Sequence, residues 1–114
     1  MPKTIDLSLK ISIAASFFTR FKGLMFRKEP IKDEGLLILP CNSIHMFFMK
    51  FSIDVVLLSK EGTIIKTISD LKPWEMVPPV KRAYATLELP SGTLEKYRIK
   101  EGDRISVKGK PLIA

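Results

Sequence analysis

The sequence predicts a mainly β domain: a small barrel-like or curled sheet of antiparallel or mixed strands, with one or two short helices. Two observations carry this prediction: short apolar segments recur along the chain, and turns rich in Gly or Pro separate them. The chain has 114 residues, of which 46% are hydrophobic and 27% charged. A domain of this size buries a core without needing disulfides, so we predict a single domain over residues 1–114.

The first predicted strand covers residues 5–13, where apolar and polar side chains alternate without a break. A period of two predicts a half-buried strand with one face toward solvent. Such regular alternation is atypical of a parallel strand that is covered on both faces. We expect five side chains of this segment to be buried, namely Ile5, Leu7, Leu9, Ile11 and Ile13.

The apolar spacing then changes to that of a helix between Phe17 and Met25, with Ser16 in position to cap it and Pro30 to end it. Residues 44–58 are the most apolar part of the chain, and their β-branched and aromatic side chains predict a strand, bent near residues 51–52. The other predicted elements are strands over residues 35–39, 63–69, 84–89 and 104–109, a loop over 72–80 and a short helix over 91–97.

The formal net charge of +7 is compatible with an anionic partner such as nucleic acid. The basic residues are nevertheless spread along the chain, and the densest cluster holds only Arg20, Lys22, Arg27 and Lys28. A scattered distribution is more typical of a solubility feature than of a nucleic-acid interface, so nucleic-acid binding is an alternative here and not the main interpretation.

Cys41 is the only cysteine, which excludes an intrachain disulfide and favours a reducing compartment. The sequence has neither a signal-type N-terminus nor an apolar run of about 20 residues, so we expect a cytoplasmic protein that does not associate with membranes. The single Asn and the absence of Gln, beside many Lys, are a tendency of hyperthermophile proteins.

Several motifs occur in an order that resembles the family catalogued as domain of unknown function 192. They are Arg20 with GLM at 23–25 and Arg27, then Gly35, PCNSIHMFFMKFSIDVV over 40–56, KPW over 72–74, LELPSG over 87–92, and Gly102-Asp103. The resemblance covers nearly the whole chain, and the block over 40–56 is its most specific part. It implies a small β-rich, barrel-like domain and brings no established activity. Many relatives carry an export signal, and its absence here favours the cytosol.

His45 is the only histidine and the first candidate for acid–base or metal chemistry. Its neighbours Cys41, Met46 and Met49 are ligands of soft metals, but a regular strand directs Met46 away from His45, and a zinc site needs more Cys or His. A Cys41–His45 nucleophilic pair would be separated by about 13 Å on an extended strand. We predict no metal, no cofactor, and a His45 buried among Phe and Met side chains, with no carboxylate within hydrogen-bonding reach.

Two carboxylates, Asp54 and Glu88, lie within apolar runs and match the family motifs. A buried carboxylate needs a partner, so we expect Arg20 or Arg27 to contact one of them as a clamp between helix and sheet. A sharper alternative is that the arginines hold an anionic ligand. Trp74, in the Pro-rich loop, is either a lid or an exposed contact residue.

We interpret the chain as a small non-enzymatic binding module for an acidic ligand or a protein partner. The proposed ligand-binding residues are Arg20, Arg27, His45, Asp54, Trp74 and Glu88. One alternative is a small hydrolase that uses His45 with Asp54 or Glu88, and another is nucleic-acid binding through the basic surface. We assign no catalytic residue.

Overall fold

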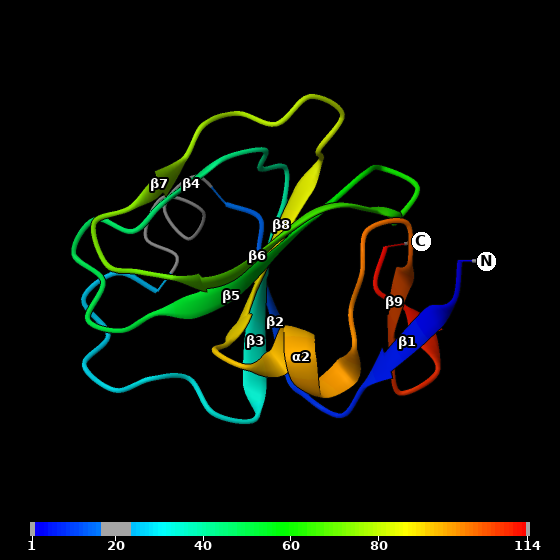
Figure 1. The fold of residues 1–114 in the computed structure, drawn as a ribbon, viewed down its shortest axis with the longest axis horizontal. Helices are drawn as coiled ribbons and strands as arrows, with labels where there is room; N and C mark the ends of the chain where they lie inside the picture. Colours follow the sequence, from blue (N-terminus) through cyan, green and yellow to red (C-terminus); the bar gives the residue numbers. More distant parts are fainter. Residues whose placement is uncertain (1, 17–23, 114) are drawn as a thin grey trace.

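A computed structural model of the chain describes residues 2–16 and 24–113. Its fold is mainly β, as predicted (Figure 1). The strands are β1 (Thr4–Leu7), β2 (Lys10–Ala14), β3 (Glu34–Ile38), β4 (Ile44–His45), β5 (Ile53–Leu58), β6 (Ile64–Leu71), β7 (Met76–Val77), β8 (Ala85–Pro90), β9 (Arg104–Val107) and β10 (Lys110–Pro111). The helix within the described residues is α2 (Thr93–Tyr97). None of the helices among these residues has the length and apolar character needed to cross a membrane.

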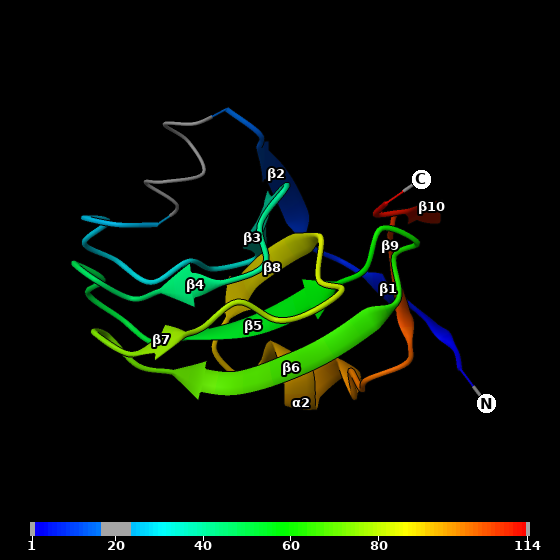
Figure 2. The ribbon, with the colours of Figure 1, turned by 90° about the horizontal axis from the view of Figure 1, so that it is seen from above.

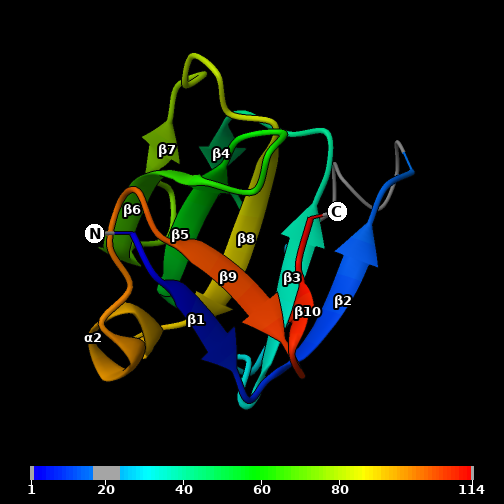
Figure 3. The same ribbon diagram turned by 90° about the vertical axis from the view of Figure 1, so that its right-hand side faces the viewer.

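The strands form three sheets of unequal size. The largest has the order β2-β3-β8-β5-β6, with β8 antiparallel to both of its neighbours. A second sheet has the order β1-β9-β10 and lies in front of the large sheet in Figure 3. β4 and β7 form a short antiparallel pair, which Figure 2 places at the far end of the molecule from β1 and β9.

Each face of the large sheet packs against its own apolar cluster. On one face, Leu87 and Leu89 of β8 pack in a cluster with Leu7 of β1, Ile105 of β9 and Leu94 of α2. The second cluster lies on the other face. Its members include residues of β5 and of the segments around β4 and β7: Leu24, Ile31, Ile44, Met46, Met49, Phe51, Ile53, Val55, Leu57, Leu71 and Val77. Because apolar groups cover both faces, every residue of β5 is buried.

The N-terminal segment departs from its prediction beyond residue 9. It forms two strands that belong to different sheets, and both pair in parallel, β1 with β9 and β2 with β3. Leu9 is buried as expected, but Ile11 is only half-buried and Ile13 is 67% exposed. The break near Ser8 redirects the chain, so the regular alternation does not describe one continuous buried face.

The prediction of one strand over residues 44–58 was wrong. Residues 46–52 separate β4 from β5, and the two strands belong to different sheets. The loop predicted over 72–80 contains the short strand β7, which pairs with β4. The strands predicted over 35–39 and 84–89, the hairpin of β5 with β6 and the short helix α2 are confirmed. The helix predicted from Phe17 lies largely in residues 17–23, outside the described part of the chain.

Candidate functional site

Three tight turns meet beside β4 and β7, and each presents an aromatic side chain. In each turn the N–H of the fourth residue donates to the carbonyl of the first, at 3.3, 3.2 and 3.1 Å for residues 24–27, 46–49 and 72–75. The third residues are Phe26, Phe48 and Trp74, whose φ angles are 65°, 62° and 71°. A positive φ at this position is the signature of a type II turn, which favours glycine.

Aromatic residues at glycine-type positions are strained. A non-glycine residue in the left-handed region costs on the order of 1–3 kcal/mol and persists only when the surroundings hold it. Here the turns hold one another. The Phe26 N–H donates to the Phe48 carbonyl at 3.1 Å, and the Trp74 N–H donates to the Met46 carbonyl at 2.8 Å. The Met46 N–H in turn donates to the Glu75 carbonyl at 2.8 Å, so the three turns are joined as one unit.

The rings of these turns form a continuous exposed surface. Phe48 lies between its neighbours, with centroid distances of 5.1 Å to Phe26 and 5.2 Å to Trp74. Phe47 contacts Trp74 at 5.8 Å and His45 at 4.9 Å. Phe26, Phe48 and Trp74 are 57%, 47% and 60% exposed. We call the set Phe26, Phe47, Phe48, Trp74 and Met76 the aromatic surface.

Met76 extends this surface along β7. It is the cross-strand partner of His45 in the β4–β7 pair, which directs both side chains to the same face. Met76 is 61% exposed. Beneath the surface, Leu24, Met46 and Met49 are buried in the second apolar cluster. The turns over 24–27 and 46–49 are therefore anchored in this cluster, while the rings of Phe26 and Phe48 stay exposed.

His45 lies at the edge of the aromatic surface. Its Nδ1 accepts a hydrogen bond from the Phe47 N–H at 3.3 Å, which places the proton of the neutral ring on Nε2. The side chain is half-buried, so the prediction that it is largely buried was wrong. The expected contact with Phe side chains and with backbone is present. The expected lack of a neighbouring carboxylate stays a prediction.

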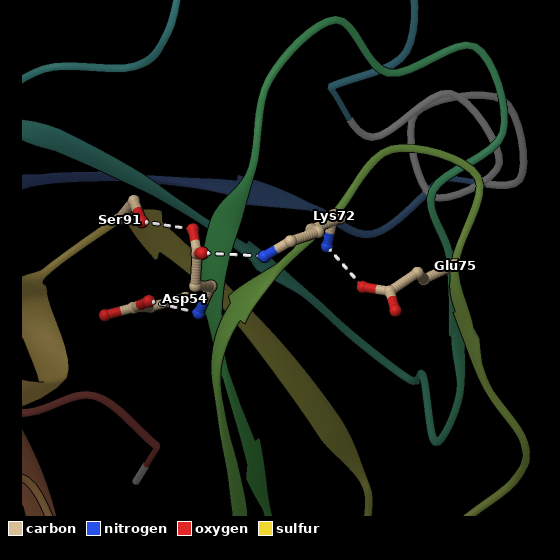
Figure 4. Close-up of polar contacts among 5 residues, drawn as sticks. Asp54, Lys72, Glu75 and Ser91 are labelled. Atoms are coloured by element: carbon tan, nitrogen blue, oxygen red, sulfur yellow. Dashed lines mark hydrogen bonds and ion pairs between the residues drawn. The ribbon is translucent and has the colours of Figure 1, made fainter.

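Charged side chains flank the three turns. Arg27 pairs with Glu34 at 2.8 Å, and Lys72 pairs with Asp70 at 3.0 Å. The ammonium of Lys72 and the hydroxyl of Ser91 hold the pKa of Asp70 below its usual value, and Asp70 raises the pKa of Lys72. Figure 4 also shows Glu75, whose carboxylate Oε1 accepts a hydrogen bond from the backbone N–H of Lys72 at 2.7 Å.

Asp54 is a structural tie that lies away from the aromatic surface. Its side chain is fully buried, and its Oδ1 accepts the N–H of Asp70 at 2.9 Å (Figure 4). Its Oδ2 accepts the N–H of Gly92 at 3.1 Å and of Leu94 at 2.9 Å. Asp54 thus joins β5 to the end of β6 and to the start of α2, and backbone amides supply the partners that we expected from arginine.

Glu88 is also buried, and it lies on β8. Its neighbours across the sheet are Leu36 on β3 and Val55 on β5, both of which belong to the side of the second apolar cluster. Within residues 2–16 and 24–113 its Oε1 has no hydrogen-bond partner, and burial raises the pKa of the Glu88 carboxyl to about 8. Arg27 pairs with Glu34 instead, so Arg27 does not supply the clamp. A contact from Arg20 to Asp54 or Glu88 stays a prediction. Arg20 lies outside the described residues.

The structure therefore divides the predicted site. It brings His45 and Trp74 to one surface, with Arg27 next in sequence to Phe26, and it places Asp54 and Glu88 inside the core. Sequence reasoning missed Phe26, Phe47, Phe48 and Met76. The available signal was the adjacent Phe47-Phe48 pair, too apolar on both faces for a strand with one wet side.

Comparison with known proteins supports the resemblance. The family model DUF192, described as uncharacterized ACR, matches residues 2–107. A UPF0127 protein of Pyrococcus horikoshii is 36% identical over 108 residues, covering 90% of this chain and 91% of the relative. A UPF0127 protein of Pyrococcus furiosus is 31% identical over 105 residues, covering 88% of both chains. A third, from Thermococcus kodakarensis, is 34% identical over 102 residues, covering 85% of this chain and 64% of the relative.

These relatives come from thermophilic archaea, in line with the amide-poor, Lys-rich composition. The fold also occurs in a crystal structure of a protein of unknown function from Novosphingobium aromaticivorans. That structure matches with a TM-score of 0.75 at 24% identity, covering 84% of this chain and 73% of its own. The family match spans nearly the whole sequence, and the chain belongs to the DUF192 family.

Proposed function

We propose that this protein is a non-enzymatic docking module whose aromatic surface binds apolar side chains of an acidic polypeptide segment. The observation that carries the proposal is the contact between three aromatic residues that all occupy left-handed turn positions. Glycine would fill each position with less strain and would satisfy the fold. We explain the exposed rings at these positions by a role in binding a partner.

The composition of the surface favours a protein partner. Aromatic residues, Met and Arg are enriched at the centres of protein interfaces, and Trp often carries a large share of the binding energy. The aromatic surface joins Trp74, three Phe rings and Met76, with Arg27 directly beside Phe26. Because the turns are joined by hydrogen bonds before any partner binds, little further ordering of the backbone is needed on binding.

The charge of the chain favours an acidic partner. The net charge is +7, and exposed Arg27, Lys28, Lys50 and Lys72 lie next to the aromatic turns. Two of these cations already have carboxylate neighbours, Glu34 for Arg27 and Asp70 for Lys72. A continuous phosphate backbone would be repelled by those carboxylates, whereas a polypeptide of mixed sequence tolerates them. We therefore favour a polypeptide over nucleic acid.

The hydrolase alternative receives little support from the same geometry. Both oxygens of Asp54 accept backbone hydrogen bonds inside the core. Glu88 is enclosed by apolar strands. A general base must reach a substrate proton, and neither carboxylate is open to solvent.

A displayed library of random peptides, about 12 residues long, tests the proposal when it is selected in parallel on the protein and on Trp74→Gly. The variant removes the indole without straining the turn, because position 74 already has a positive φ. We expect the native protein to enrich acidic peptides that carry Leu, Phe or Trp. These peptides should bind Trp74→Gly at least about tenfold more weakly.

The matched control is Ile13→Ser, which removes an exposed apolar side chain outside the aromatic surface. This control should bind the selected peptides as the native protein does. An equal loss in the control, or no enrichment over Trp74→Gly, contradicts the proposal. The proposal is also contradicted if the native protein binds a labelled oligothymidylate or anionic vesicles more tightly than the selected peptides, and if Trp74→Gly abolishes that binding. The ligand would then be nucleic acid or lipid.

A further inference from the structure

A hollow lies beside the turn that joins β5 to β6. In Figure 1 this turn lies at the opposite end of the large sheet from β4 and β7. The hollow has a volume of about 360 Å³. We call it the hairpin cavity, and its lining consists of Ser59, Lys60, Glu61, Thr63, Ile65 and Arg82.

We infer that the hairpin cavity binds a small oxyanion, a phosphate or a carboxylate, independently of docking at the aromatic surface. Two cations and two hydroxyl groups line the same hollow. Oxyanions are recognised by charged N–H groups and by hydroxyl donors, and hydrogen bonds that involve a charge are the stronger ones. The hairpin cavity combines both kinds of donor within the volume of one small ligand.

The two hydroxyl groups are arranged as donors. Ser59 Oγ already accepts the Thr63 N–H at 3.1 Å, and Thr63 Oγ1 accepts the Arg104 Nη1 at 3.3 Å. A hydroxyl has one proton to donate besides its lone pairs. Because each oxygen already accepts a hydrogen bond, each hydroxyl proton remains for an acceptor in the cavity. Anions are such acceptors.

Arg82 occupies the same kind of turn position as the aromatic residues. The Ala83 N–H donates to the Val80 carbonyl at 3.1 Å, and Arg82, third in this turn, has a φ of 70°. Glycine would again be less strained at this position. A guanidinium presents several N–H donors in a fixed plane, which matches a phosphate or a carboxylate. The strained turn therefore places an oxyanion-binding group at the cavity.

Lys60 supplies the second positive charge, and its neighbours keep it there. Its Nζ lies 5.8 Å from the centre of the Tyr84 ring, within the range of a cation–π contact. Arg104 stabilises the same turn, because it donates hydrogen bonds to the Glu61 carbonyl and to Thr63 Oγ1. The turn that carries Lys60 is thus braced at two points.

Glu61 opposes an anion from the same lining. With Lys60 and Arg82 it leaves the lining one formal positive charge. The Glu61 carboxylate should weaken binding of any oxyanion that enters the cavity. Its removal by Glu61→Gln should therefore strengthen binding, an effect that a purely structural role for these residues does not predict.

Titration of the whole chain with inorganic phosphate, and separately with citrate, tests the inference by calorimetry and by amide chemical shifts. We expect saturable binding, with shifts of the amides over residues 59–63. Arg82→Gly should weaken binding about tenfold while it keeps the fold, since the backbone at position 82 suits glycine. Glu61→Gln should tighten binding by about threefold or more. The two titrants distinguish a phosphate ligand from a carboxylate one.

Lys66→Ala is the matched control, because it removes one exposed positive charge of β6 that does not line the cavity. Its affinity should equal that of the native protein. Three results would each overturn the inference: no saturable shift up to about 10 mM of either anion, an equal loss in Lys66→Ala and Arg82→Gly, or unchanged binding in Glu61→Gln. Since Trp74→Gly should leave this binding intact, the result is independent of the docking proposal.

Discussion

The turns over residues 72–75 and 100–103 have the same hydrogen bond but very different residues at the third position. In both, the N–H of the fourth residue donates to the first carbonyl, at 3.1 and 3.2 Å. The third residue is Trp74 in one turn, with φ of 71°, and Gly102 in the other, with φ of 91°. The second turn therefore follows the ordinary preference for glycine, and the first violates it.

The comparison distinguishes a residue that the turn backbone favours, Gly102, from one that it does not favour, Trp74. In the described part of the chain no atom lies within 4 Å of a Cβ built at Gly102, so the role of this glycine is to relax the backbone. Trp74, with Phe26 and Phe48, maintains the same backbone form under strain and exposes its ring. A turn that keeps an exposed aromatic ring at a strained position is organised around its surface, which is the basis of the docking proposal.

The largest expected effect is on the free energy of unfolding, and it comes from Glu88, which is buried in the core beneath the aromatic surface. Because the pKa of Glu88 is about 8 in the folded protein and near 4.5 when unfolded, the folded state keeps a proton that the unfolded state releases between these values. The free energy of unfolding should therefore fall as the pH rises from about 4.5 to 8 and level off above. The decrease has an upper limit of about 5 kcal/mol.

Glu88→Gln keeps the shape of the side chain and removes the titration. Urea unfolding of both proteins at several pH values between about 5 and 9 checks the prediction, and the variant should be the more stable at the alkaline end. If both proteins show the same slope with pH, the raised pKa of Glu88 is contradicted.

The next test removes the support beneath one aromatic turn. Met46 is fully buried at the first position of its turn, whereas Lys100, the first residue of the glycine turn, is exposed. Met46→Ala should lower the free energy of unfolding by about 2–5 kcal/mol, because it leaves a cavity in the core. Lys100→Ala should change it by less than about 0.5 kcal/mol. Equal effects in thermal unfolding would show that the two turns are supported alike.

A smaller effect is expected when the glycine turn receives a side chain. Gly102→Ala should destabilise the protein by about 1–2 kcal/mol, since a Cβ is unfavourable at φ of 91°. The space around Gly102 is open, so the loss would report the backbone alone. A neutral result in chemical denaturation would mean that positive φ is not a constraint in these turns.

The smallest effect compares two substitutions at the opposite turn. Trp74→Gly and Trp74→Ala both remove the ring and its contacts with Phe47 and Phe48. Only glycine also relieves the strain of the backbone, partly offset by its greater freedom when unfolded. Trp74→Gly should therefore be the more stable by about 0.5–1 kcal/mol. The reverse order would remove the argument from strain.

Much of the fold could be predicted because its signals are local. Residues 35–39 and 84–89 are short apolar runs bounded by turn residues, and the Gly62 turn indicated the β5–β6 hairpin. The parallel pairing of β1 with β9 could not be predicted, because periodicity reports which face is buried and not which strand lies alongside.

The candidate site was harder to predict for a related reason. The turn over residues 46–49 contains no Gly, Asn or Pro, so its aromatic residues looked like part of a strand. Trp74 was placed in a loop because Pro73 precedes it, and it is the residue of the aromatic surface that sequence reasoning found. A strained turn lacks the residues by which turns are recognised, which is why Phe26 and Phe48 were missed.

The pairing of β1 with β9 has a consequence for synthesis of the protein on the ribosome. Thr4 pairs with Arg104, and Asp6 Oδ1 accepts hydrogen bonds from Ser106 Oγ and from the Gly109 N–H. β1 is thus translated about 100 residues before its partner β9. Until then Ile5 and Leu7 lack the strand that covers them, and the nascent chain exposes an apolar edge that chaperones can recognise.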